Sequence, residues 1–278
     1  MDISKQEVAM ALKAVRMTRW LPVMVMGLLV GTASGPVAAD YVAEVTADNP
    51  FAWWRFEDAG SSSGSAATDS AGVFDGTYNG DTELIAGVVG KSARLDGDFD
   101  YVEIGAIGSL PVQGSLEFWM RAEVMENYRN VLTTGLYTNT NAGGIRFEEN
   151  TAGNFIVAIG DDSGSVADYT AILISGFETG QWVHVVTTWD TAIGLISVYI
   201  DGVVVFDDDS NGFWPAQLGN VFIGLGYGWH EERCWQGDVD EVAVYSSRLD
   251  ATRVQAHYDA VGPVFSDGFE SGTTDAWD

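Results

Sequence analysis

Residues 181–206 constrain the fold more than any other stretch of the chain, because their side chains alternate with a period of two. They read QWVHVVTTWDTAIGLISVYIDGVVVF, with two alternating runs separated by a short polar break. This period, built from β-branched and aromatic residues, is typical of β-strands. Asp201 and Gly202 follow the second run, and an Asp-Gly pair favours a type I′ turn with positive φ at both central residues. The segment therefore predicts two antiparallel strands that lead into a tight hairpin.

The same segment resembles part of a known domain family. Its stretches WVHV (182–185) and VYIDG (198–202) are similar to the core motif of laminin-G-like, concanavalin A-like domains of bacterial secreted proteins. Three further stretches match in the same order: WRFE (54–57), RLDG (94–97) with DYV (100–102), and GDVDEV (237–242). The resemblance spans residues 50–260 and implies an all-β fold: an antiparallel two-sheet β-sandwich, the concanavalin A-like jelly roll, with one short C-terminal helix. The family includes binding, adhesive and structural modules, so it does not imply a single function.

Residues 1–39 are predicted to be an export signal peptide rather than part of the fold. Basic residues precede a short apolar core at residues 20–30, and the segment ends in the small residues Val37, Ala38 and Ala39. The apolar core is shorter than the ~20 residues that a membrane-spanning helix needs. An uncleaved amphipathic anchor is the alternative interpretation. Cleavage after Ala39 would give a secreted or cell-surface protein.

The rest of the chain is interpreted as one β-sandwich, residues 40–263, and a short tail, residues 264–278. Sandwiches of this length occur as single domains. Asp250 is a good N-cap, and Val254 and Tyr258 lie four residues apart, which predicts a helix over residues 251–258. The tail resembles a D-G-F-E-S-G…W ending of unrelated secreted bacterial proteins, which implies a sorting role. A frayed terminus with docked aromatic side chains is the alternative.

Charge excludes two classes of partner. Of 13 basic residues four lie in residues 1–39, and of 40 acidic residues two do, so residues 40–278 hold 9 basic and 38 acidic residues, a formal net charge of −29. Such a field repels nucleic acid and anionic membranes. A net negative charge of this size favours solubility and the binding of divalent cations. The alternative is that the charge only prevents aggregation. A single cysteine, Cys234, means that the chain forms no internal disulfide.

The resemblance also raises the question of glycan hydrolysis. Hydrolases with this fold place carboxylates at alternate positions of one strand, E-x-D-x-E, and glycoside hydrolysis needs two carboxyl groups flanking the scissile bond. Here Asp238 and Asp240 alternate, but Val242 stands at the third position and Glu241 is expected on the other face. The sequence therefore predicts no enzyme activity, and a glycan hydrolase or lyase is the least favoured alternative.

A structural calcium site is a further expectation. If the alternation holds, Asp240 shares a buried face with Val242 and Val244, and a buried carboxylate must be paired, hydrogen-bonded or metal-bound. The resemblance implies a calcium ion near the sandwich edge, held by acidic residues of the first and last strands, and calcium prefers six to eight oxygen ligands. The candidate ligands are Glu57, Asp58, Asp75 and Asp240, with Asp69 also in reach. The alternative is that Asp240 pairs with Arg55 or Arg94, or accepts hydrogen bonds from backbone N–H groups.

Ligand binding is predicted in two aromatic loops, because these aromatic residues lie outside the alternating runs. The candidate residues are Trp214, Tyr227, Trp229 and His230. Aromatic faces stack on sugar rings, and a neighbouring His can hydrogen-bond to hydroxyl groups. The alternative is that these rings pack on loop hinges. The leading functional hypothesis is a secreted, non-enzymatic binding or adhesion module for carbohydrate or a cell-surface glycan, stabilised by calcium; the second is a structural surface protein without a small ligand.

Overall fold

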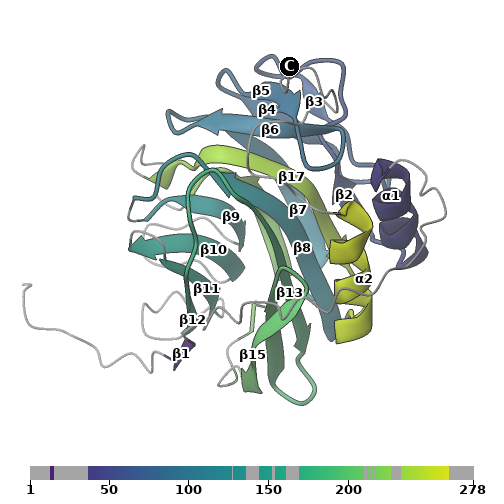
Figure 1. The fold of residues 1–278 in the computed structure, drawn as a ribbon, viewed down its shortest axis with the longest axis vertical. Coiled ribbons are helices and arrows are strands. Elements are labelled where there is room, and N and C mark those ends of the chain that lie inside the picture. Colours follow the sequence, from purple (N-terminus) through teal and green to yellow (C-terminus); the bar gives the residue numbers. More distant parts are fainter. Residues whose placement is uncertain are drawn as a thin grey trace, which may run out of the picture.

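The chain folds into two β-sheets packed face to face, with two helices against one outer face (Figure 1). The computed structural model describes residues 13–15, 37–126, 128–135, 144–151, 154–160, 169–209, 212, 214–215, 217–226 and 233–262. Within these residues all neighbouring strands are antiparallel except β1 and β12. The expected fold class, an antiparallel two-sheet sandwich with a C-terminal helix, is confirmed.

One sheet has nine strands and the other has eight, including one strand that lies off the main path. The nine-stranded sheet runs, in spatial order, β1 (Lys13–Val15), β12 (Tyr169–Ser175), β11 (Asn154–Gly160), β10 (Gly144–Thr151), β9 (Asn130–Gly135), β16 (Gln217–Ile223), β7 (Tyr101–Ser109), β4 (Gly76–Asn79) and β3 (Ala66–Ala67). The other runs β15 (Val203–Asp209), β14 (Leu195–Ile200), β13 (Trp182–Asp190), β8 (Gln113–Ala122), β17 (Gln236–Tyr245), β6 (Lys91–Asp96) and β5 (Glu83–Ala86), and β2 (Ala52–Trp54) pairs with β17.

The predicted strands at residues 181–206 are confirmed as β13, β14 and the start of β15. β13 and β14 pair with Val185 opposite Ile200. The turn after β14 has φ of 50° at Asp201 and 77° at Gly202, so both central residues have the positive φ that a type I′ turn requires. The local sequence therefore determines this hairpin.

Both alternating sets of β13 side chains are buried, but in different layers. Val183, Val185 and Trp189 belong to the core between the sheets. Trp182 and Val186 belong to a second apolar cluster, on the outer face of this sheet, which the helices cover. The strand therefore shows alternation in the direction of its side chains without alternation in their burial.

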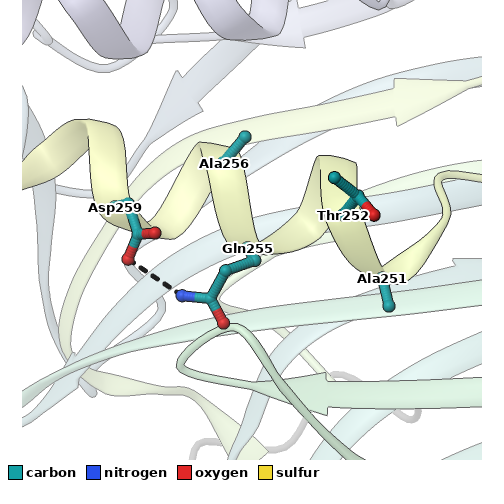
Figure 2. Close-up of a pocket in the computed structure, with 5 residues that line it drawn as sticks. All are labelled: Ala251, Thr252, Gln255, Ala256 and Asp259. Atoms are coloured by element: carbon teal, nitrogen blue, oxygen red, sulfur yellow. Dashed lines mark hydrogen bonds between the residues drawn. The ribbon is translucent and has the colours of Figure 1, made fainter.

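The C-terminal helix α2 (Ala251–Val261) confirms the predicted helix. The Asp250 side chain accepts hydrogen bonds from the backbone N–H groups of Thr252 and Arg253, as an N-cap does. Figure 2 shows α2 above the β14–β15 hairpin. A Cβ atom built on Gly202 would lie 2.9 Å from the Gln255 side chain, so the turn packs closely against the helix.

The helix α1 (Val37–Ala47) and strand β1 were not predicted, because their residues belong to or adjoin the segment interpreted as an export signal. The two helices pack against each other (Figure 1). Most of the predicted signal peptide, residue 263 and the predicted tail, residues 264–278, lie outside the described residues. Neither described helix is long and apolar enough to span a bilayer.

A β-bulge in β17 corrects one sequence-based expectation. The pairing of β17 with β8 shifts register between Asp240 and Ala243, and Glu241 has a φ of 50°. Val239 and Val242 consequently both lie in the core between the sheets, although they are three residues apart. The expectation that Asp240 shares a face with Val242 was wrong, because the bulge turns both Asp240 and Glu241 toward the outer, helix-covered face.

We predict that Gly202→Ala lowers the free energy of unfolding by about 1–2 kcal/mol. The cause is the cost of a left-handed backbone for a residue with a Cβ atom, together with the close approach to Gln255. Urea unfolding followed by circular dichroism measures the change. Gly60→Ala is the matched control, because no atom lies within 4 Å of a Cβ built there, and it should change stability by less than about 0.5 kcal/mol. Equal effects of the two substitutions would contradict the prediction.

Candidate functional site

A single buried carboxylate, that of Glu117 on β8, joins both helices to the sheet. Glu117 is fully buried. Its carboxylate accepts hydrogen bonds from Tyr41 of α1 at 3.1 Å and from Tyr245 of β17 at 2.7 Å. His184 Nε2 of β13 lies 2.8 Å away and His257 Nδ1 of α2 lies 3.0 Å away. A buried charge needs such partners, and here they come from both helices and two neighbouring strands.

The chain of charges continues from His257 to α1. His257 Nε2 lies 2.8 Å from Asp48 Oδ2, just after the end of α1. Arg253 of α2 pairs with the same Asp48 oxygen at 2.8 Å and with Glu44 of α1 at 2.6 Å. Alternating acidic and basic groups therefore fasten the two helices to each other as well as to the sheet.

These contacts shift the pKa values of the groups. Burial alone would raise the pKa of Glu117, but the charge of His257 and the hydrogen bonds of both imidazoles lower it below its usual value. Burial alone would lower the pKa of His257, but the Glu117 charge and the hydrogen bonds to Glu117 and Asp48 raise it. Burial and the Glu117 charge raise the pKa of Tyr41 and of Tyr245. The arrangement favours a carboxylate beside an imidazolium.

The Glu117 network combines carboxylate, imidazole and phenol, as catalytic sites do, but it is closed to solvent. Glu117, His184 and His257 each have no exposed surface. Trp119 and Tyr258 stack on His184 and so cover that ring. The geometry supports a structural role for these residues.

Asp240 is fully buried and is satisfied by the backbone. Its Oδ2 accepts the Val89 N–H at 3.0 Å and its Oδ1 the Glu241 N–H at 2.8 Å. Burial, followed by the Glu241 charge, raises the pKa of Asp240 well above its usual value, against the effect of these N–H donors. Of the alternatives open from the sequence, the structure shows the backbone-bonded carboxylate.

The other charges of β17 are paired with arginines. Glu241 accepts from Trp53 Nε1 at 2.6 Å and lies 3.1 Å from Arg55 Nε. Burial raises the pKa of Glu241 to about 8, although Arg55 opposes the shift. Asp238 pairs with Arg94 and with Arg121. Each of the acidic residues that could have formed a hydrolase motif, namely Asp238, Asp240 and Glu241, therefore makes an ion pair or accepts hydrogen bonds within the fold.

The predicted calcium ligands lie around two different loops. Glu57 Oε1 accepts the Lys91 N–H at 2.9 Å, so it is fixed by the same β5–β6 turn that provides the Val89 N–H to Asp240. Asp58 accepts from the Tyr78 hydroxyl at 2.8 Å, and Asp75 accepts from the Asp69 N–H at 2.9 Å. These four residues do not form a close group of ligand atoms, and their calcium role stays a prediction.

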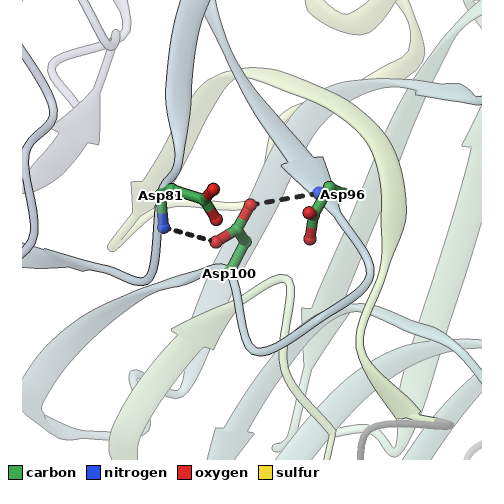
Figure 3. Close-up of side chains that lie close together, drawn as sticks. All are labelled: Asp81, Asp96 and Asp100. Carbon is green, nitrogen blue, oxygen red and sulfur yellow. Dashed lines mark hydrogen bonds between the residues drawn. The ribbon is translucent and has the colours of Figure 1, made fainter.

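Three other aspartates do form such a group. Asp81, Asp96 and Asp100 place carboxylate oxygens within 4.8 Å of one another (Figure 3). Asp81 lies between β4 and β5, whereas Asp96 and Asp100 flank the turn between β6 and β7. Asp100 is buried, and its oxygens accept the backbone N–H groups of Asp81 at 2.7 Å and Asp96 at 3.2 Å. Two loops that connect the two sheets are thus joined through one carboxylate.

The electrostatics of this group suit a cation. Burial raises the pKa of Asp100 to about 6, and the charges of Asp96 and Asp81 add to the shift, while the two backbone N–H groups oppose it. A divalent ion would relieve this repulsion, and three carboxylates are hard oxygen donors of the kind that calcium prefers. The sequence motif RLDG…DYV contains two of the three residues, Asp96 and Asp100. In the sequence this motif indicated the family and not a cation site.

Of the predicted carbohydrate-binding residues, one lies in the described part of the chain. Trp214 is half-buried and packs against the core between the sheets. Tyr227, Trp229 and His230 lie outside the described residues. A hollow on the surface of α2 is lined by short or flexible side chains: Ala251, Thr252, Gln255, Ala256 and Asp259 (Figure 2). It contains neither an aromatic ring nor a pair of carboxylates, so we assign it no ligand.

The family model for the concanavalin A-like lectin/glucanases superfamily matches residues 96–255, more than half of the chain. The chain belongs to this family. The match includes β8, β13 and β17, which carry Glu117, His184 and the bulge at Asp240. A search of curated proteins finds no match to the sequence.

Solved structures share the fold at low sequence identity. Domain 4 of AbnA, a GH43 extracellular arabinanase from Geobacillus stearothermophilus solved in complex with arabinotriose, matches with a TM-score of 0.58 and 20% identity, covering 75% of this chain and 98% of that one. The botulinum neurotoxin serotype D ligand-binding domain, in complex with N-acetylneuraminic acid, matches with a TM-score of 0.61 and 14% identity, covering 79% and 52%. The serotype G binding domain gives 0.59 and 14%, covering 76% and 50%. The chain thus spans about half the length of the neurotoxin domains, and these similarities establish the fold alone.

We predict that His257 contributes stability that is lost at alkaline pH. Its pKa is raised in the folded state, so the contribution is complete below the unfolded value of ~6.5 and disappears as pH rises through the folded value. A tenfold difference in proton affinity between the folded and unfolded states corresponds to about 1.4 kcal/mol of stability. The measurement is the free energy of unfolding of wild type and His257→Asn between pH 5.5 and about 9.

The difference between the two proteins should shrink as pH increases. Gln255→Ala, on the same helix, is the control and should follow the wild-type pH dependence. If the free energies of unfolding of wild type and His257→Asn differ by the same amount at every pH, the proposed role of His257 in the network is wrong.

Proposed function

We propose that this protein is a secreted, non-enzymatic module that binds carbohydrate, such as a cell-surface glycan, with a fold stabilised by calcium. The observation that carries the proposal is the match to an arabinanase domain over 98% of that domain's chain. A domain of the same fold, matched over 75% of this chain, therefore occurs in a complex with an oligosaccharide. The botulinum neurotoxin serotype D ligand-binding domain, of whose chain the match covers 52%, is likewise known in complex with a sugar, N-acetylneuraminic acid.

The acidic residues of β17 support the non-enzymatic part. Hydrolysis of a glycoside needs two carboxyl groups that reach the scissile bond. Asp238, Asp240 and Glu241 are each buried, and each is engaged by arginine, tryptophan or backbone donors. The buried Glu117 is likewise committed to the helices.

For the cation we propose Asp81, Asp96 and Asp100 as ligands. Their support is the grouping of three carboxylates and the raised pKa of Asp100. A bound calcium ion would neutralise these charges and join the β4–β5 loop to the β6–β7 turn. The sequence-predicted set of Glu57, Asp58, Asp75 and Asp240 remains a second proposal. A calcium ion at these carboxylates would compete with the backbone N–H groups that already donate hydrogen bonds to them.

The binding function is tested on an array of neutral, uronic and sialylated glycans probed with the full chain. We expect reproducible binding to a subset of glycans, and loss of that binding in Trp229→Ala, one of the predicted ligand residues. Trp214→Ala extends the test to the other predicted aromatic loop. Release of new reducing ends during incubation would favour the hydrolase alternative. Absence of binding to every glycan, together with self-association, would favour a structural surface protein.

The calcium proposal is tested by thermal unfolding in EDTA and in excess calcium. At 100 times its dissociation constant an ion adds about 2.7 kcal/mol, which raises the midpoint by a few degrees for a chain of this size. We expect Asp81→Asn to abolish the rise. Asp98→Asn, an exposed acid in the adjacent turn, is the matched control and should preserve it. A rise that survives Asp81→Asn but is lost in Asp58→Asn would transfer the site to the sequence-predicted set.

A further inference from the structure

A second charged cluster lies on the face of the nine-stranded sheet that points away from the core. Along β10, Ile145 and Phe147 belong to the core between the sheets, so the alternating residues Arg146 and Glu148 stand on the opposite face. Arg233 reaches the same place, because the next residue, Cys234, forms a bridge with Asn130 of β9, and Asn130 pairs with Glu148. Neither the Glu117 network nor the aspartate group includes these residues.

The Oε2 atom of Glu148 lies near two guanidinium groups without a close hydrogen bond to either. This oxygen is 3.6 Å from Arg146 Nε and 3.5 Å from Arg233 Nη1. These distances allow ion pairing but are too long for good hydrogen bonds. The Glu148 side chain is 6% exposed, and among the described residues its Oε2 has no hydrogen-bond donor. A buried acceptor in this state is costly, and a hydroxyl group that entered between the guanidinium groups would satisfy it.

An exposed aromatic ring borders this cluster. The Arg233 guanidinium lies 5.3 Å from the centre of the Tyr128 ring, and Tyr128 is 49% exposed. Tyr128 has a φ of 74°, an unfavourable value for a bulky residue. Its backbone is held there by Glu149 O, which accepts the Tyr128 N–H at 2.6 Å, and by Asn130 Nδ2, which donates to Tyr128 O at 2.8 Å. Strained backbone that presents an exposed side chain is a recurrent feature of binding sites.

We propose that Tyr128, Arg146, Glu148 and Arg233 form a subsite for a neutral saccharide. In it, the sugar ring stacks on Tyr128, the guanidinium groups donate to ring hydroxyls, and Glu148 accepts from one hydroxyl while orienting both arginines. This inference rests on the proposed carbohydrate-binding function and names the chemical class of the ligand.

Charge favours a neutral sugar over an acidic one. Among the described residues of this region, Glu126, Glu148 and Glu149 match Arg129, Arg146 and Arg233 in number, so this part of the cluster has no excess positive charge to attract an anion. The whole chain carries a formal charge of −27, which opposes the approach of anionic ligands. Balanced donors and acceptors instead match vicinal hydroxyl groups, which both donate and accept hydrogen bonds.

The test uses the full chain and four named probes: arabinotriose, cellotriose, mannotriose and N-acetylneuraminic acid, measured by isothermal titration. We expect binding of at least one neutral trisaccharide, weakened about tenfold or more in Tyr128→Ala and in Glu148→Gln, as for the loss of an anchor residue. Phe99→Ala is the matched control for Tyr128, because Phe99 is also exposed and has a φ of 56°. Glu103→Gln is the control for Glu148, because Glu103 lies on β7 between the core residues Val102 and Ile104, on the same face. Both controls should bind as wild type does, and circular dichroism verifies that every variant is folded.

The outcomes separate the subsite from the function on which it rests. Neutral sugar binding that is unchanged in both Tyr128→Ala and Glu148→Gln overturns the subsite and leaves the carbohydrate-binding proposal intact. Binding of N-acetylneuraminic acid alone overturns the neutral class and also leaves the broader proposal intact. If none of the four probes binds and no glycan on the array binds, both the subsite and the carbohydrate-binding function are overturned.

Discussion

The burial of Glu117 is the interaction on which the arrangement of the outer layer depends. A carboxylate without exposed surface persists because Tyr41, Tyr245, His184 and His257 surround it. Removing one partner would leave a charge uncompensated in an apolar layer, which is far more costly than the loss of an exposed ion pair. Because two of these partners lie on α1 and α2, the helices are integral to the sandwich and their outward surface is fixed relative to both sheets.

Local patterns in the sequence were sufficient to predict the elements whose conformation depends on neighbouring residues alone. The Asp201-Gly202 turn and the Asp250 N-cap depend on residues within a few positions, and both are confirmed. The bulge at Asp240 and Glu241 could not be read from alternation, because a register shift is imposed by the neighbouring strands. Helix α1 was not predicted because its first residues belong to the segment interpreted as an export signal and the rest directly follow it.

The candidate sites were harder to predict, because they join residues from distant segments. Glu117 is one charged residue in an otherwise alternating strand, and nothing in its neighbourhood indicates that four partners will converge on it. Asp81 meets Asp96 and Asp100 only after the loops of two sheets come together. Asp240 was correctly identified as a buried carboxylate that needs partners, but its donors are backbone N–H groups, which have no sequence signature.

The pairing of β2 with β17 has a consequence for the order of folding. Trp53 of β2 donates its indole N–H to Glu241, 188 residues later in the chain, and Arg253 of α2 reaches back 205 residues to Asp48. A chain emerging from its N-terminus cannot complete this sheet until its last strand is available. Pairings of such long range make folding slow. The sheet that both helices cover therefore reaches its complete pairing only after β17 has been synthesised.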